Sequence, residues 1–543
     1  MRLGAVRRLA ILAALSAGAP ALAQTSPAQI GANRLDQNQP IARPGPPTHK
    51  PNRARRPTPV VKPFVLREVQ ISGSTASPQL LQAAYAPFIG KTVDGKGVNA
   101  VTEAVAGAYE HADIAFYTVI APTQDFAGGV LRLTVVEGYV ESATVKGDHR
   151  RAGAALAQVY ADKLLTQRPL KKSRLERDIS LIRDIPGAKP EMQLDPGDAQ
   201  GAVKLTVDPN SEKVQFGAAI NNRGTAFLGR TQVQADAIVN SLFRSGDQTR
   251  ISVAIPTDID RFQLYGVSHS TPLDTDGTTL TLSANYLHTK PEVLDVDGKA
   301  YLASVQLSHP VIRSYRTNLY ANVSLDGINS NNALLGQRFS DERTRALRGG
   351  LSFTTYDDNN LLTVIGSASL GLDILGARVD NPEASKQDFR KFNLKLGFNH
   401  SFTPDIVLRL SGVGQATPDL LPASELMALG GDEFGRGYEA SFVEGDDGYA
   451  GSAELALRPS RGLPQVLSGS EVYVFADKGQ VRSKSRFGLP GSVLGIASAG
   501  GGVRVSVASR TVIELEAARG LANPIPGLDR ETWRGVVSAR TNF

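Results

Sequence analysis

The sequence predicts a transmembrane β-barrel of about sixteen antiparallel strands, preceded by two small α+β modules. Three observations predict this fold. Strand-like segments with alternating apolar and polar residues recur from residue 213 to residue 543, and a βααββ pattern occurs twice before them. The chain also ends on an aromatic residue, Phe543, inside its last strand-like segment. Alternation over about ten residues is typical of barrels with lipid outside and water inside.

The first residues predict export from the cytoplasm. Arg2, Arg7 and Arg8 precede a short apolar stretch at 9–17, and Ala21-Leu22-Ala23 has the pattern of a cleavage site. Residues 1–23 are therefore predicted to be a signal peptide. No later apolar stretch reaches the roughly 18 residues that a membrane-spanning helix needs, so we expect strands to cross the membrane.

Residues 24–63 are predicted to be a basic periplasmic linker. Eight prolines between positions 40 and 63 exclude a regular helix or a central strand there. A short helix within residues 27–37 stays open, and so does the question whether it plugs a pore.

Two α+β modules follow, at 64–137 and 138–209. The first is predicted to contain a strand at 64–72, helices at 78–89 and 98–111, and strands at 117–121 and 130–136. The second is predicted to contain a strand at 140–146, helices at 152–165 and 170–182, and strands at 191–194 and 202–207. Two copies of one unit indicate an array of modules, each with a sheet edge that could accept a further strand.

Residues 213–543 are predicted to form the barrel. The expected strands lie near 213–222, 229–242, 247–256, 261–270, 278–288, 299–309, 316–325, 347–356, 361–372, 389–400, 405–415, 449–458, 470–478, 498–508, 511–520 and 533–543. These 331 residues give about 21 per strand and connection, a size typical of bacterial barrels. A soluble β-sandwich also alternates, but a turn as long as 326–344 would be unusual in one.

The connection at 416–448 is the candidate functional segment, because loops of that length are generally functional or disordered. It contains Gly435-Arg436-Gly437-Tyr438. Glycines let a backbone approach a wall closely, and a guanidinium held there needs a carboxylate partner.

The candidate partner lies on the segment that reads EVYVFAD at 471–477. If Val472 and its alternate neighbours face lipid, then Tyr473, Phe475 and Asp477 face the lumen. Our hypothesis is that the loop folds into the barrel and Arg436 bonds Asp477, with Glu454 as the second candidate. The alternative is that Arg436 lies in solvent at a loop tip.

Other classes of function find little support. The net charge of +6 is spread along the chain without a nucleic-acid-binding motif, and the seven histidines lack metal-ligand spacing. The GDDG sequence at 445–448 lacks the ligand spacing of calcium loops, and no nucleophile elbow or Walker loop occurs. We therefore expect no catalytic residue, metal, cofactor or nucleic-acid partner.

The modules resemble POTRA domains, and LERDISLIRDIPGAKPEMQLDPGDAQGAVKLTV at 175–207 is similar to the second POTRA domain of two-partner secretion transporters. The Gly435–Tyr438 sequence resembles the (V)RG(F/Y) motif of the BamA/TpsB superfamily, with Gly435 where valine is usual. Phe475-Ala476-Asp477 resembles that superfamily's inward F-x-D motif, and Asn221-Asn222-Arg223-Gly224 resembles the opening of a two-partner secretion barrel.

This resemblance to the TpsB transporters of the ShlB/FhaC/HecB type implies an outer-membrane pore. It implies export of an unfolded TpsA-type exoprotein, a haemolysin- or adhesin-like cargo, through POTRA domains and lumen. It also implies contact with outer-membrane lipids and, during biogenesis, with the barrel assembly machinery. The alternative is a BamA-like factor that inserts other barrels, although such proteins generally carry more than two POTRA domains.

Overall fold

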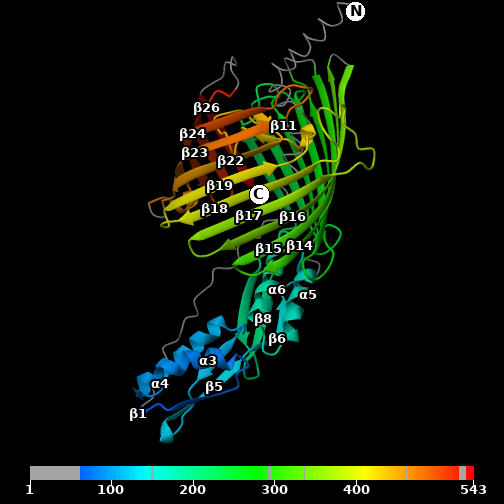
Figure 1. Cartoon of the computed structure of the whole chain (residues 1–543). Coiled ribbons are helices and arrows are strands. Elements are labelled where there is room, and N and C mark those ends of the chain that lie inside the picture. The colour runs from blue at the N-terminus through cyan, green and yellow to red at the C-terminus, as the bar shows by residue number, and fades with distance from the viewer. Residues whose placement is uncertain (1–60, 148–151, 292–295, 335–336, 460–461, 525–532) are drawn as a thin grey trace, which may run out of the picture. The chain divides into compact units, whose positions relative to one another are not determined.

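The structure is a computed structural model that describes residues 61–147, 152–291, 296–334, 337–459, 462–524 and 533–543. The predicted signal peptide and nearly all of the predicted linker, including its possible short helix, lie outside these residues. The chain divides into two compact units: one of α+β modules up to Lys213, together with 313–315, and one of residues 214–312 and 316–543 (Figure 1). Among the described residues, no helix is both long enough and apolar enough to cross a membrane.

The first module packs two helices on a three-stranded sheet of order β2-β5-β4. Its elements are β1 (Phe64–Val65), β2 (Glu68–Ser72), α3 (Pro78–Tyr85), β3 (Thr92–Val93), α4 (Gly95–Ala108), β4 (Tyr117–Ile120) and β5 (Val130–Glu137). Helix α4 begins where the Asp94 carboxylate accepts the backbone N–H groups of Lys96 and Gly97, which satisfies two of its free donors. Val98, Val101 and Val105 then follow at helical spacing, and all three are buried in the module core.

The second module repeats this arrangement with the sheet order β6-β8-β7. Its elements are β6 (Tyr139–Val145), α5 (Ala154–Asp162), α6 (Lys172–Asp184), β7 (Glu191–Pro196) and β8 (Ala202–Asp208). In the first sheet β2 pairs with β5 in parallel and β4 pairs with β5 antiparallel, and in the second sheet β6 and β7 pair with β8 in the same two ways. Strands β2 and β4 therefore form the edges of the first sheet, and β6 and β7 form those of the second.

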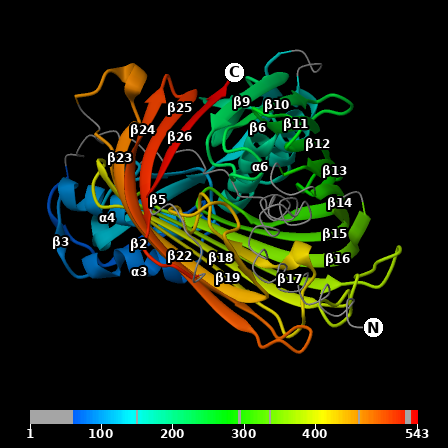
Figure 2. The same ribbon diagram turned by 90° about the horizontal axis from the view of Figure 1, so that it is seen from above.

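The second unit is a closed barrel in which all sixteen predicted strands are present. They are β9 (Val214–Asn221), β10 (Gln232–Asn240), β11 (Gln248–Pro256), β12 (Phe262–Pro272), β13 (Thr279–Thr289), β14 (Val296–Arg313), β15 (Thr317–Leu334), β16 (Gln337–Tyr356), β17 (Asn360–Gly371), β18 (Arg390–Ser401), β19 (Ile406–Ala416), β22 (Asp447–Leu457), β23 (Glu471–Ser483), β24 (Ser492–Val507), β25 (Thr511–Gly520) and β26 (Trp533–Asn542). Each strand pairs with its sequence neighbour, and β26 closes the ring against β9 (Figure 2).

The two faces of the wall differ as the alternation predicts. On β23 the side chains of Val472 and Val474 are exposed, whereas Tyr473, Phe475 and Asp477 are buried toward the interior. The outward side chains can meet lipid, and the inward polar ones can meet water or each other.

The prediction of a long turn at 326–344 is wrong. Strands β15 and β16 continue to pair through this segment, from Asp326 opposite Ala346 to Leu334 opposite Gln337. Polar side chains predominate on both faces of this segment, as we expect for a strand that extends beyond the lipid. Backbone pairing continues there although the apolar alternation has stopped, so the sequence pattern resembled a turn.

Candidate functional site

The connection between β19 and β22 folds into the barrel interior. It runs from 417 to 446 and contains a short ribbon of β20 (Met427–Leu429) and β21 (Val443–Gly445). Its apolar side chains pack on inward residues of the wall in one buried cluster. That cluster consists of Met427, Leu429, Phe434, Tyr438, Phe442 and Val443 from the loop with Ala450, Val481 and Ile496 from the wall. The loop is thus held by an apolar contact as well as by charges.

Arg436 is 6% exposed and extends from this loop between two wall glutamates. Its Nη1 lies 2.9 Å from Glu454 Oε2 on β22, and its Nη2 donates to Glu516 Oε2 on β25. The guanidinium carbon lies 3.7 Å from the ring centroid of Phe475, which adds a cation–π contact. Because a buried cation without partners is strongly unfavourable, these contacts specify where the loop docks.

The predicted side-chain pair between Arg436 and Asp477 is not present, and Arg436 pairs instead with the second candidate, Glu454, and with Glu516. Asp477 accepts the backbone N–H of Gly435 at 2.8 Å and that of Arg436 at 3.3 Å, and the Ser498 hydroxyl at 2.6 Å. The carboxylate therefore binds the turn of the loop, while the guanidinium reaches past it over Phe475. Asp477 lies two residues beyond Phe475 on β23, at the level of the loop backbone.

The two glycines of the motif are required by different contacts. Gly435 has φ +76°, and a side chain there would begin 2.3 Å from Ile496 Cδ1. Ile496 thus occupies the space that a side chain at position 435 would need. At Gly437 a Cβ would lie 2.5 Å from the backbone nitrogen of Gly520, so only glycine lets the loop approach β25 this closely.

Tyr438 anchors the other side of the motif. Its hydroxyl lies 2.7 Å from the carbonyl oxygen of Ala522 and 3.1 Å from that of Ala497. Arg534 of β26 donates to the Tyr438 carbonyl oxygen. The Arg-Gly-Tyr sequence therefore ties the loop to β22, β24, β25 and β26.

Arg436 belongs to a larger ion-pair network on the inner wall. Glu454 also accepts from Arg409 and Arg504, each at 2.7 Å. The Tyr473 hydroxyl lies 2.9 Å from Glu514 Oε1 and 2.8 Å from Glu516 Oε2, so it can donate to either carboxylate. Within the described part of the chain, the linked side chains are Arg223, Arg409, Arg436, Arg458, Arg504, Glu454, Glu471, Glu514, Glu516 and Tyr473. Ion pairs that share partners lose less side-chain entropy per pair than isolated ones.

Two further carboxylates of the same loop form ion pairs with basic residues outside this network. Glu425 is 1% exposed, lying 2.6 Å from Arg348 of β16 and 2.7 Å from Lys391 of β18. Asp446 of the GDDG sequence is paired with Arg486 at 2.7 Å, so this aspartate serves an ion pair. Among the described residues, no cluster of side chains could hold a metal ion.

A polar cavity of about 440 Å³ remains beside the docked loop. It is lined by network residues such as Arg409 and Glu454 and by Asp432 and Glu433 of the loop. This open part of the interior is thus lined by charged side chains.

Several residues of the site were not found by sequence reasoning, chiefly Glu516, Glu514 and Arg504. The alternation in 511–520 carries the signal for two of them, because an outward Leu515 places Glu514 and Glu516 on the inner face. Nothing in the alternation, however, indicates which inward carboxylate the loop arginine meets.

A sixteen-stranded barrel with a folded-in loop and a preceding POTRA module defines an outer-membrane transporter whose POTRA domains are periplasmic. The family model for haemolysin secretion/activation proteins ShlB/FhaC/HecB matches residues 200–505, more than half of the chain, and the ShlB-type POTRA model matches residues 64–138. The chain belongs to the ShlB/FhaC/HecB family and is a transporter of two-partner secretion.

Individual relatives agree with this assignment. The heme/hemopexin transporter protein HuxB of Haemophilus influenzae is 21% identical over 83% of this chain and 82% of its own length. The outer membrane transporter CdiB of Escherichia coli O6:K15:H31 is 23% identical over 71% of this chain and 67% of its own.

Solved structures share the fold. CdiB from Escherichia coli has a TM-score of 0.73 at 20% identity and covers 96% of this chain and 98% of its own. BamA from Haemophilus ducreyi lacking POTRA domains 1–3 has a TM-score of 0.50 at 13% identity, covering 88% and 100%. BamA is thus a more distant structural neighbour than CdiB, which favours a transporter over a BamA-like assembly factor.

Proposed function

We propose that this transporter receives an unfolded exoprotein on the free strand edges of its POTRA modules and passes it through the barrel lumen to the cell surface. The modules present edges at β2, β4, β6 and β7, where an extended segment could add as a further strand. HuxB and CdiB are named as transporters, which supports a polypeptide cargo of the same secretion class for this chain.

The buried position of Arg436 is the observation that carries the mechanistic part of the proposal. A loop that only shielded the pore would not need a guanidinium enclosed by Glu454, Glu516 and Phe475. We propose that this contact holds the loop in the conformation that supports transport, and that Asp477 fixes the turn that presents Arg436.

The proposal is tested by replacing Arg436 with alanine and measuring secretion and barrel insertion separately. We expect insertion to persist, because the strands and their ladder are unchanged, and secretion of the partner exoprotein to fall by at least about tenfold, since two glutamates lose a buried partner. Arg482→Ala is the matched control, because Arg482 is exposed at the rim and pairs with Asp447 outside the network. Secretion at the wild-type level in Arg436→Ala would exclude the docked loop from the mechanism.

The cargo part has a test of its own. A photo-crosslinking amino acid placed along β4 or β7 should trap the secreted exoprotein during export. Capture of nascent barrel proteins instead would favour an assembly factor.

A further inference from the structure

The outward face of β11–β16 is hollowed, although the outside of a barrel wall is usually convex. The hollow has a volume of about 1030 Å³, above the usual range of roughly 300–1,000 Å³ for ligand pockets. Ala284, Ala303 and Gly327 provide small residues in its lining, and Leu282, Val305 and Leu325 provide large apolar ones. Ala284 and Ala303 are cross-strand neighbours on β13 and β14.

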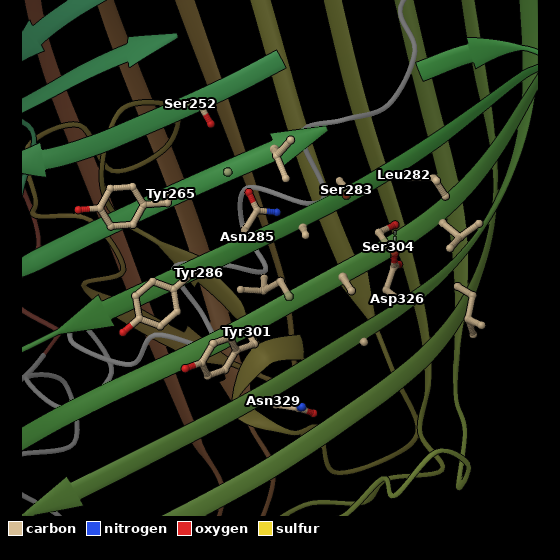
Figure 3. Close-up of a pocket in the computed structure, with 18 of the residues that line it drawn as sticks. Ser252, Tyr265, Leu282, Ser283, Asn285, Tyr286, Tyr301, Ser304, Asp326 and Asn329 are labelled. Atoms are coloured by element: carbon tan, nitrogen blue, oxygen red, sulfur yellow. Dashed lines mark hydrogen bonds between the residues drawn. The ribbon is translucent and has the colours of Figure 1, made fainter. Parts of the chain in front are cut away.

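Three tyrosines form a row across this hollow. Tyr265, Tyr286 and Tyr301 are register partners on β12, β13 and β14, and their ring centroids are 6.5 Å and 5.1 Å apart (Figure 3). Tyrosine rings on the outside of a barrel mark the level where hydrocarbon gives way to polar headgroups.

The row lies toward the cell surface. The barrel begins at Val214, directly after the periplasmic modules, so β13 runs from the periplasmic side to the surface side and β14 returns. Tyr286 is near the surface end of β13, and Tyr301 is near the surface end of β14. The hollow therefore opens into the outer leaflet, with Leu282 and Val305 on the deeper side of the tyrosines.

Arg345 brings a positive charge to the same hollow. It is the register partner of Gly327, and its Nη atoms donate to the carbonyl oxygens of Ile328, Thr344 and Leu375 and to the Asn329 amide oxygen, at 2.8–3.2 Å. These oxygens carry no net charge. Within the described ranges, no carboxylate forms an ion pair with Arg345.

The carboxylates near Arg345 do not neutralise it. Arg343 lies two residues before it on the same outward face, and Arg343 and Arg378 share the carboxylate of Asp341. Asp380 adds a second carboxylate, which accepts the backbone N–H of Asp341. Asp326 also lines the hollow, but its carboxylate is paired with Arg348 at 2.7 Å, so among the described residues Arg345 keeps an uncompensated positive charge next to the apolar lining.

We propose that this hollow binds one molecule of lipopolysaccharide from the outer leaflet. Its acyl chains would lie between the tyrosine row and the deeper aliphatic residues, and a lipid A phosphate would lie at Arg345. An anionic amphiphile matches both halves of the site, because the walls are apolar and the excess charge is positive. The volume suits a lipid with several acyl chains, and lipopolysaccharide is the anionic lipid of that leaflet.

The test is native mass spectrometry of the purified full-length protein in detergent, with lipid A as the probe and phosphatidylglycerol as the competitor. We expect the wild type to retain one lipid A in the presence of equal phosphatidylglycerol. Arg345→Gln removes the charge, and Ala284→Leu with Ala303→Leu fills the hollow. Each change should lower the bound fraction by about tenfold, whereas Arg345→Lys, which keeps the charge, should lose much less.

The opposite wall provides matched controls. Ala453 and Ala476 are likewise outward cross-strand neighbours, and Lys478 is an exposed outward cation two residues further along β23. Ala453→Leu with Ala476→Leu, and Lys478→Gln, should leave retention unchanged. Heat-modifiable electrophoretic mobility verifies that every variant is folded.

Three results would overturn the proposal. One is equal retention of lipid A by Arg345→Gln and wild type, and another is equal retention by the filled variant. The third is displacement of lipid A by an equal concentration of phosphatidylglycerol, which would make the hollow a general contact for anionic phospholipid.

Discussion

The guanidinium carbon of Arg436 lies 3.7 Å from the ring centroid of Phe475, and this contact joins the interior loop to the barrel wall. Gly500 and Gly502 of β24 make room for the wall aromatics, since a Cβ at Gly500 would lie 2.9 Å from the Phe475 ring and one at Gly502 would lie 2.6 Å from the Tyr473 hydroxyl. The positions of the Phe475 and Tyr473 rings therefore depend on these glycines of the neighbouring strand β24.

Replacing Phe475 with leucine should weaken loop docking without opening the barrel. The change keeps an apolar side chain but removes the ring face, which is worth about 0.5–2 kcal/mol for a desolvated cation–π contact. Trypsin cleavage after Arg436 measures this, because cleavage needs the loop to leave the lumen. Phe392→Leu, on the exposed outward face, should leave the cleavage rate unchanged.

Exchanging the charges of Arg436 and Asp477 should not restore secretion. Asp477 binds the backbone of the loop, whereas the guanidinium binds Glu454 and Glu516, so an arginine at 477 would face backbone N–H donors. We expect the double variant Arg436→Asp with Asp477→Arg to secrete no more than Arg436→Asp alone. Recovery of secretion in the double variant would contradict the geometry and support direct side-chain pairing.

Replacing Gly437 with alanine should displace the loop. The added methyl group would lie 2.5 Å from the backbone nitrogen of Gly520 and 2.7 Å from the carbonyl carbon of Arg519, and neither backbone atom can move aside easily. Faster trypsin cleavage after Arg436 and lower secretion are expected. Gly366→Ala on β17 is the matched control, since a Cβ there has open space.

Asn222 should stabilise the seam where the barrel closes. Strands β9 and β26 have five register pairs, and the Asn222 side chain extends them by donating to the Gly535 carbonyl oxygen and accepting the Val537 N–H, both at 2.9 Å. Asn222→Ala removes both bonds, each worth about 1 kcal/mol, so the temperature of heat modification should fall by several degrees. Asn399→Ala, in the middle of the sheet on β18, should lower the temperature of heat modification less.

Asp178 should make the second module more stable at lower pH. It is buried in α6 beside Arg174 at 2.5 Å, and its burial raises the pKa of the carboxyl above the usual range. An acid whose pKa is higher in the folded state binds more protons there. Its favourable contribution is therefore complete below the unfolded pKa and is lost as pH rises through the folded pKa.

Hydrogen exchange of residues 172–184 in the full-length protein measures this dependence. Protection should decline as pH rises from the ordinary carboxyl pKa to the raised pKa of Asp178, and Asp178→Asn should abolish this decline. The exposed Asp162→Asn should preserve it. Protection that increases with pH over this window would show that the Arg174 contact outweighs burial.

The strands and their faces could be predicted from sequence because each depends on local periodicity. Side chains alternate along a strand, so an outward Val474 fixes Phe475 as inward without knowledge of the neighbouring strands. The βααββ modules likewise follow from apolar spacing, although α4 begins at Gly95, three residues before the predicted start at 98. The extended hairpin of β15 and β16 was missed because its pairing continues outside the region where apolar alternation is required.

The partner of Arg436 depended on the tertiary structure. The sequence alone determined that a glycine-flanked arginine and several inward carboxylates exist, and it placed Asp477 and Glu454 among them. Which carboxylate the guanidinium reaches depends on strand stagger, on the path of a 30-residue loop and on the ring of Phe475 beneath it. These are distances between residues far apart in the chain, and local periodicity contains no information about them.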